Sequence, residues 1–240
     1  MPRVTRDSLA HVGRDIVACE LCPRLRSWCE EVARKKVKRF RDEEYWGRPV
    51  PGFGDPSARL LIVGLAPGAH GANRTGRVFT GDRSGDFLFA ALHRAGFASQ
   101  PTSVTRGDGL RLHDCYIAPL ARCAPPANKP TPGELDLCRA YLAREWRLLT
   151  RIRAVLALGK MAMDGFLALL RAEGRLPPRP ARAFGHGVEH AIGRGMVLFA
   201  SYHPSQQNTF TGKLTPASFD AVLHRIRLHL DSPGISRSAS

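Results

Sequence analysis

The sequence predicts an α/β protein with a mostly parallel central sheet. Four short apolar runs have the composition of strands, and segments with helical patterning separate most of them, as in consecutive βαβ units. The strands are expected at 59–63, 116–121, 154–158 and 195–200.

Helix signals support this rhythm. The clearest helix opens at Thr131, which is followed by a proline at the first helical position and by Glu134 three residues after the cap, and it runs through about Arg151. Thr215 and Pro216 open the last helix in the same way. Further helices are expected over 6–18, 84–95 and 160–172, and loops over 98–113 and 173–187.

Length and composition predict one domain. The chain has 240 residues, of which 43% are hydrophobic, and this is enough for one substantial core. We expect the domain to span residues 1–230 and to be monomeric. The small, polar and unpatterned segment 231–240 is expected to be a disordered C-terminal tail.

Charge indicates the partner. The formal net charge is +15 and the pI is about 10.5, so nucleic acid is the leading candidate among polyanions. No apolar run approaches the roughly 18 residues of a membrane-spanning helix, and we find no signal peptide or lipidation motif, so we expect no membrane partner. A cytoplasmic location, with nucleoid association through DNA binding, is the expectation. The basic run 34–41 either contacts DNA or forms an ordinary solvated surface, and both interpretations stay open.

Four of the six cysteines have an arrangement typical of metal ligands. Cys19 and Cys22 form a C-x2-C pair that lets two thiolates face one centre. Cys123 leaves a predicted strand and Cys138 lies two turns into a predicted helix, so all four can meet at one edge. Four thiolates suit zinc or an iron–sulfur cluster, and ordinary core cysteines are the alternative. Two further cysteines fit the pattern less well and read as small buried hydrophobes, Cys29 and Cys115.

A glycine-rich segment, GLAPGAHGANRTGRVFTGD over 64–82, follows the first predicted strand. Its glycines match neither of the two common phosphate-binding spacings. Two other loops rich in polar residues and prolines follow strands at 122–129 and 201–208. Ligands of open α/β sheets bind outside the carboxyl ends of the strands, so we expect one cleft lined by all three loops.

These features together resemble the iron–sulfur uracil-DNA glycosylases, most closely their family 5, also called type B. The resemblance rests on the segment 64–82, on RCAPP over 122–126, on YHPS over 202–205 and on the order of the four cysteines, and it covers roughly residues 15 to 230. It implies a three-layer α/β/α sandwich of the uracil-DNA glycosylase type. It also implies a [4Fe-4S] cluster on the four cysteines as cofactor.

The implied activity is that of a monofunctional DNA glycosylase in base excision repair. Such an enzyme flips uracil out of DNA and hydrolyses its N-glycosidic bond, and hypoxanthine and other deaminated bases are further candidate substrates. Phe79, which otherwise reads equally well as a core residue, resembles the aromatic platform for the flipped base. His203 would donate a hydrogen bond to the departing base. The expected substrate-binding set is Gly64, Ala66, Gly68, Phe79, Asn128 and Ser205, although Asn128 also reads as a turn residue after two prolines.

One departure from the family pattern concerns the attacking water. The best-known members carry an aspartate at the position of Ala66, where no carboxylate is available here. Asn73 or Asp82 could anchor the water instead, and the sequence does not decide between them. An asparagine that reads uracil in family 4 is also absent, because the corresponding positions are Ala118 and Pro119, which favours a broader pocket.

The alternative is a non-catalytic nucleic-acid-binding module stapled by an iron–sulfur cluster or by zinc. It explains the charge and the cysteines but gives no reason for His203, Phe79 and the glycines to follow strands together.

Overall fold

The computed structural model describes residues 7–176 and 182–232. Its centre is a six-stranded sheet of order β1-β3-β2-β4-β6-β5, in which the four inner strands are parallel and the two edge strands are antiparallel to their neighbours. The mostly parallel sheet is therefore confirmed. The strands are β1 (Phe53–Gly54), β2 (Leu60–Gly64), β3 (Cys115–Pro119), β4 (Ala154–Leu158), β5 (Glu189–Ala191) and β6 (Val197–Ser201).

The predicted strands differ from these in their ends. The second begins one residue earlier than expected and ends at Pro119, and the fourth runs from Val197 through Ser201. The two edge strands were not predicted, because a strand of two or three residues leaves no periodicity to detect.

Eight α-helices are described, together with 3₁₀ turns at Lys38–Phe40 and Pro126–Asn128. The capping boxes predicted at Thr131 and Thr215 are both present. The α-helices are α1 (Leu9–Val17), α2 (Pro23–Lys35), α3 (Ala72–Thr75), α4 (Arg83–Arg94), α5 (Pro132–Leu148), α6 (Lys160–Ala172), α7 (Gln206–Phe210) and α8 (Pro216–Asp231).

Three helix expectations need correction. The first helix begins at Leu9, because Ser8 caps it by accepting a hydrogen bond from the backbone amide of His11. Helix α5 ends at Leu148 rather than near Arg151. Helix α2 was not predicted, because charged residues interrupt its apolar pattern, although Leu25, Cys29 and Val32 form a buried face. The expected tail lies outside the described residues from 233 onward, and α8 continues through Asp231.

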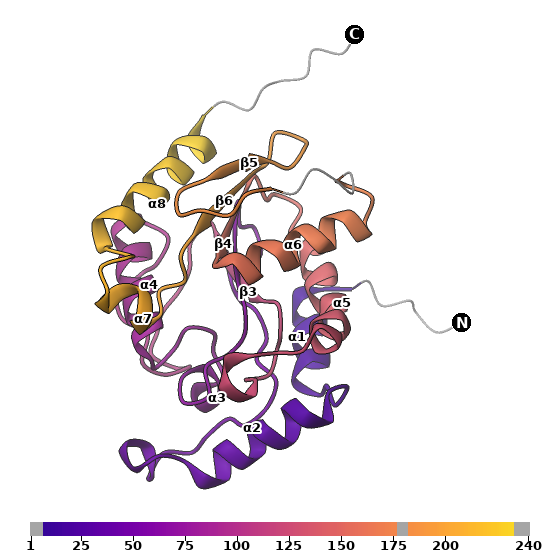
Figure 1. Cartoon of the computed structure of the whole chain (residues 1–240), viewed down its shortest axis with the longest axis vertical. Coiled ribbons are helices and arrows are strands. Elements are labelled where there is room, and N and C mark those ends of the chain that lie inside the picture. The colour runs from indigo at the N-terminus through magenta and orange to yellow at the C-terminus, as the bar shows by residue number, and fades with distance from the viewer. Residues whose placement is uncertain (1–6, 177–181, 233–240) are drawn as a thin grey trace.

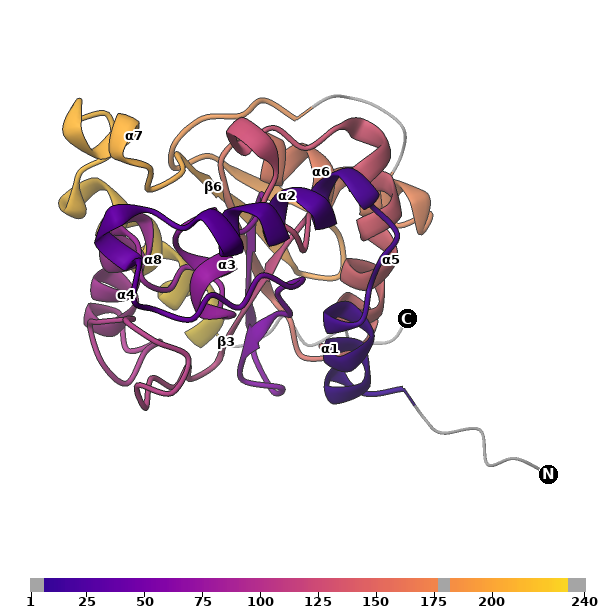
Figure 2. The ribbon, with the colours of Figure 1, turned by 90° about the horizontal axis from the view of Figure 1, so that it is seen from below.

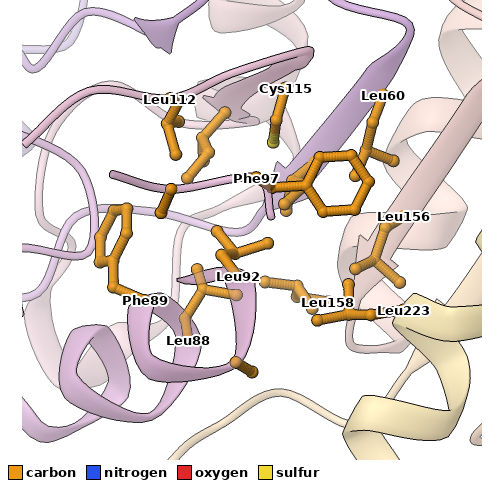
Figure 3. Packing of buried hydrophobic residues seen from close by; sticks show 14 of the residues in the cluster. Leu60, Leu88, Phe89, Leu92, Phe97, Leu112, Cys115, Leu156, Leu158 and Leu223 are labelled. Carbon is orange, nitrogen blue, oxygen red and sulfur yellow. The ribbon is translucent and has the colours of Figure 1, made fainter. Parts of the chain in front are cut away.

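The helices form a layer on each face of the sheet (Figure 1). Helices α4 and α8 pack together on one face, and α1, α5 and α6 cover the other. Successive residues of β2 alternate between the two cores: Leu60 and Ile62 pack with α4 and α8, whereas Leu61 and Val63 pack with α5 and α6. Figure 3 shows the first core. The three-layer α/β/α sandwich is confirmed.

Helices α2 and α3 lie beyond the carboxyl end of the sheet, nearest the viewer in Figure 2. A buried ion pair between Arg122 and Glu145 ties the loop after β3 to α5, and Arg122 and Glu145 are each about 1% exposed. No helix in the described ranges is long and apolar enough to cross a membrane.

Candidate active site

A cavity of about 850 Å³ opens at the carboxyl end of the sheet. Loops after β2, β3 and β6 all line it, as the topology of a parallel sheet requires. The single cleft expected from sequence is therefore present. Eight residues of the expected site line it: Gly64, Ala66, Gly68, Phe79, Asp82, Asn128, His203 and Ser205.

Glycines in the first loop make room for two of these side chains. A Cβ at Gly64 would lie 3.2 Å from the Phe79 ring. A Cβ at Gly68 would lie 3.0 Å from Asp82 Oδ2, and one at Gly71 would lie only 1.9 Å from it. The glycines therefore allow an aromatic ring and a carboxylate to approach the backbone closely.

Phe79 adopts an unusual backbone conformation for a bulky residue. Its φ of +50° lies in the left-handed region. Its ring contacts the His203 ring, with centroids 5.8 Å apart and an interplanar angle of 31°. A base cannot fit between two rings at that separation, so a flipped base would meet Phe79 on the side that lines the cavity.

His203 follows the end of β6 and is held there by Asn208, whose side-chain amide donates to the His203 carbonyl at 2.8 Å. Burial lowers the pKa of the His203 imidazole to about 4. The ring is therefore neutral at pH 7 and keeps one N–H donor.

Asp82 and Asn73, the two candidates for holding water, have different environments. Asp82 lines the cavity and caps α4 by accepting a hydrogen bond from the Gly85 amide at 3.0 Å. Burial raises the pKa of Asp82, although amide donors at the helix start oppose the shift. Asn73 is fully buried outside the cavity lining, and its amide donates to the Cys29 carbonyl at 3.3 Å and to the Ala69 carbonyl at 3.4 Å.

Strand β3 contributes no amide side chain to the cavity lining. Pro119 lines the cavity and Ala118 is buried in the sheet. Asn128 was expected either to bind substrate or to serve as a turn residue. It lines the cavity and also has the positive φ, +56°, of a turn residue.

Several cavity residues were missed from the sequence. Arg39 and Phe40, from the basic run, line the mouth together with Arg83. The signal for the first two was an aromatic residue within a basic run, a pattern common at nucleic-acid surfaces. His70 also lines the cavity, and its Nδ1 lies 3.1 Å from the Tyr45 hydroxyl.

The four cysteines of the predicted metal site lie near one another, beside α2 and α5. Cys22, Cys123 and Cys138 are buried and Cys19 is half-buried. Burial raises the pKa of the Cys22 thiol to about 11, and Cys138, Cys123 and Cys19 contribute to the shift in that order.

Two arginine contacts support this site. Arg24 forms a bidentate ion pair with Glu134, at 2.7 Å for both bonds, and so joins the start of α2 to the start of α5. The backbone amide of Arg122 donates a hydrogen bond to the Cys138 sulfur, and this bond opposes the rise in the pKa of Cys138 that burial causes.

The donor set fits a thiolate-bound metal centre in its chemistry. Burial and the neighbouring thiols oppose the ionisation of Cys22 and Cys138, and a bound cation would remove that penalty. No three potential ligands within 7–176 and 182–232 form a preformed metal-binding group, and the thiol of Cys123 instead faces that of Cys29. Cys115 belongs to the main core, as expected of a small hydrophobe.

The chain matches the uracil DNA glycosylase superfamily over residues 51–227. It is 53% identical over 221 residues to a type-5 uracil-DNA glycosylase of Mycobacterium bovis, which covers 92% of this chain and 81% of that protein. It is 51% identical over 216 residues to a type-5 enzyme of Mycobacterium leprae, covering 90% of this chain and 93% of the relative. A type-5 enzyme of Thermus thermophilus is 51% identical over 208 residues, covering 87% and 92% of the two chains.

Proposed function

The chain belongs to the uracil DNA glycosylase superfamily, and on that premise we propose that it excises uracil from DNA by hydrolysing the N-glycosidic bond. The observation that carries the proposal is a single cavity lined by Phe79, a neutral His203 and Asp82. An aromatic surface, an uncharged donor and a carboxylate are the groups that base excision needs.

His203 acts on the leaving group. As the glycosidic bond breaks, the base takes the bonding electrons and negative charge spreads to its carbonyl oxygens. A neutral N–H already placed in the cavity stabilises that charge more than it stabilises the neutral base, so it lowers the barrier of the chemical step.

Asp82 holds the water that attacks the sugar carbon. It has the carboxylate that Ala66 lacks, and it lines the same cavity, whereas Asn73 lies outside the lining and its amide nitrogen donates to two backbone carbonyls. The carboxylate also offsets the positive charge that develops on the sugar. Because that charge forms as the base leaves, the water can be a late partner that needs little activation.

The reaction ends at an abasic site without strand cleavage. A glycosylase that also cuts the strand forms a Schiff base through an amine, and no lysine is among the described residues that line the cavity. The absence of a β3 amide supports a pocket that also accepts hypoxanthine and other deaminated bases.

Cys19, Cys22, Cys123 and Cys138 would hold a [4Fe-4S] cluster, with zinc as the competing metal. A bound cluster would connect the start of α2, the loop after β3 and α5, and would supply structural stability rather than electrons, since hydrolysis transfers none. The basic mouth, with Arg39 and Arg83 on the lining, would contact the phosphates of the DNA partner.

The experiment is a gel assay on a duplex that contains a single uracil, with and without alkali, and a thymine duplex as control. We expect cleavage only after alkali and only with uracil. DNA binding without abasic sites at saturating protein would instead support the non-catalytic binding module.

A further inference from the structure

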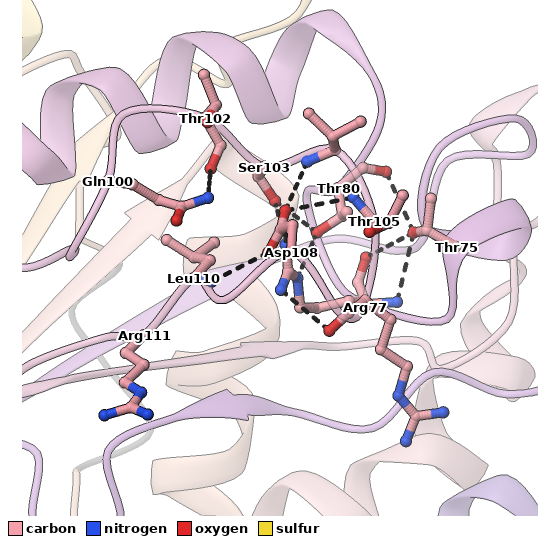
Figure 4. A network of polar contacts seen from close by, with 12 residues as sticks. Thr75, Arg77, Thr80, Gln100, Thr102, Ser103, Thr105, Asp108, Leu110 and Arg111 are labelled. Atoms are coloured by element: carbon pink, nitrogen blue, oxygen red, sulfur yellow. Dashed lines mark hydrogen bonds and ion pairs between the residues drawn. The ribbon is translucent and has the colours of Figure 1, made fainter.

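A buried polar network joins Arg77, Thr80, Ser103 and Asp108 (Figure 4), and none of these four residues lines the cavity. Phe79 lies between Arg77 and Thr80 in the chain, and its left-handed φ of +50° carries strain that persists only where neighbouring contacts hold the backbone. The residues on either side of Phe79 supply such contacts.

Thr80 forms the inner part of the network. Its hydroxyl donates to the Val78 carbonyl at 3.1 Å and accepts from Arg77 Nε at 2.9 Å. Because that hydrogen is already used, the Ser103 hydroxyl, 2.7 Å away, donates to Thr80 and in turn accepts from Arg77 Nη2 at 3.0 Å. The Ser103 carbonyl also accepts from the Gly81 amide at 2.9 Å.

Asp108 forms the outer part. It pairs with Arg77 at 2.7 Å, and the side chains of Arg77 and Asp108 are 4% and 13% exposed. Its two oxygens also accept from the amides of Val104 at 2.8 Å and Leu110 at 3.0 Å, so it shapes the loop that carries Ser103. Burial works to raise the pKa of Asp108, but these donors outweigh it and lower the pKa to about 2.

None of the three residues Arg77, Ser103 and Asp108 lines the cavity. The hydrogen bonds of Arg77 and Ser103 reach Thr80 and Gly81, the two residues that follow Phe79, and Phe79 does line the cavity. Any effect of this network on a bound base therefore passes through the position of the Phe79 ring.

We propose that Asp108 is a positioning residue for base excision: through Arg77 and Ser103 it holds Phe79 in the strained conformation that presents its ring to the flipped base. The inference rests on the proposed function only in that the cavity holds a flipped base. Loss of the carboxylate would let the 98–113 loop and the Phe79 backbone relax together.

A double-mutant cycle tests this with Asp108→Asn, Phe79→Ala and the two combined, by single-turnover rates on uracil at saturating enzyme. Removing a stacking ring lowers the rate by about 5- to 150-fold. We expect Asp108→Asn to lower the rate by about tenfold, which is part of that loss. In the Phe79→Ala background, Asp108→Asn should have no further effect on the rate. An unchanged rate for Asp108→Asn, or the same tenfold loss in both backgrounds, would overturn the proposal.

Asp114→Asn is the matched control. Asp114 pairs with Arg59 at 2.6 Å, at the amino end of the sheet and outside the cavity lining, so its loss should lower stability and leave the rate unchanged. If Asp108→Asn does not fold, Ser103→Ala completes the same cycle.

A second measurement does not depend on activity. In protein labelled with ¹³C at phenylalanine rings, the Phe79 signal should shift and broaden in Asp108→Asn and stay in place in Asp114→Asn. An inactive wild type with a shifted Phe79 signal would contradict the proposed function alone, whereas an unmoved signal would contradict the positioning role.

Discussion

At the scale of single residues, the site depends on which side chains are absent as much as on which are present. Gly71 leaves the space that the Asp82 carboxylate occupies, and Gly64 does the same for Phe79. Ala66 offers no charge, so the only carboxylate among the described lining residues is one that also caps a helix. Small residues therefore leave the space that Phe79 and Asp82 occupy in the cavity lining.

His203→Ala should lower the single-turnover rate on uracil by about 10²–10³, because one donor to a developing negative charge is removed. DNA affinity and the circular dichroism spectrum should stay unchanged. His224→Ala, on an exposed position of α8, is the matched control and should keep the full rate. A near-wild-type rate for His203→Ala would remove this donor from the mechanism.

The pH profile provides a second check on His203. With its pKa lowered to about 4, the ring is neutral above that pH, so the rate should show no titration near the ordinary histidine value of about 6.5. Only the unfolded histidine takes up the proton between these values, so this group makes the fold lose stability as pH falls from about 6.5 toward 4.

Asp82→Asn should reduce the rate by about 10²–10³, because a neutral amide no longer offsets the positive charge that develops on the sugar and orients the water less well. Asparagine also caps helices well, so α4 should stay intact. The wild-type rate should fall as pH falls through the raised pKa of Asp82, and this acid limb should disappear in the variant.

Asn73→Ala should instead cost about 1–3 kcal/mol of unfolding free energy and leave the rate of folded enzyme unchanged. A lower rate for Asn73→Ala together with an unchanged rate for Asp82→Asn would assign the water to Asn73.

Gly71→Ala tests the space beside the carboxylate. Its Cβ would overlap Asp82 Oδ2 at 1.9 Å, so the carboxylate must move and the rate should fall toward that of Asp82→Asn. Gly133→Ala, where a Cβ meets nothing within 4 Å, should leave the rate unchanged. Equal rates for the two variants would show that the Asp82 position does not matter.

At the scale of elements, strands and helices place the loops, and the loops carry the chemistry. The carboxyl ends of β2, β3 and β6 bring three distant segments to one cavity. Helix α2, which no local signal predicted, ends beside the basic run and leads it to the cavity mouth. The basic run is therefore adjacent to the site, and its contact with DNA stays a prediction.

Lys38→Ala and Arg39→Ala together should flatten the slope of log affinity against log salt by about 0.9 for each DNA phosphate that the protein no longer neutralises. The matched control is the pair Arg94→Ala and Arg147→Ala, which removes the same charge from the last turns of α4 and α5, the helices that lead into the amino ends of β3 and β4, outside the cavity lining. Fluorescence anisotropy across a salt series measures both slopes. Equal slopes for the two double variants would mean that the run is only a solvated face.

At the scale of the whole molecule, the four cysteines lie where the first part of the chain meets the α/β layers. Cys19 and Cys22 precede α2, whereas Cys123 lies in the β3–α5 connection and Cys138 lies within α5. The small apolar cluster around Cys22 and Cys29 is separate from the two main cores. A bound cluster would therefore stabilise a region that has little apolar surface of its own to bury.

Protein purified anaerobically should be brown and should contain about four irons per chain, as expected for a cluster held by four thiolates. Changing any one of Cys19, Cys22, Cys123 and Cys138 to alanine should remove the iron and lower the thermal midpoint. Cys115→Ala, in the main core, is the control: it should lower stability and keep the iron. Stoichiometric zinc without iron would show that the four cysteines bind zinc and would contradict the iron–sulfur assignment.

The sequence by itself determined the four inner strands, most of the helix starts and eight of the residues that line the cavity, because strand composition, caps and glycine-rich turns act over a few neighbouring residues. Only the tertiary structure distinguishes the environments of Asn73 and Asp82. These residues are nine positions apart in the chain, but the Asn73 amide is directed inward to the carbonyl of Cys29, whereas the Asp82 carboxylate occupies space left by Gly71 and lines the cavity. It also brought Arg39 to the cavity and Asp108 to Arg77, two residues before Phe79, since contacts between segments far apart in sequence depend on packing and leave no local pattern.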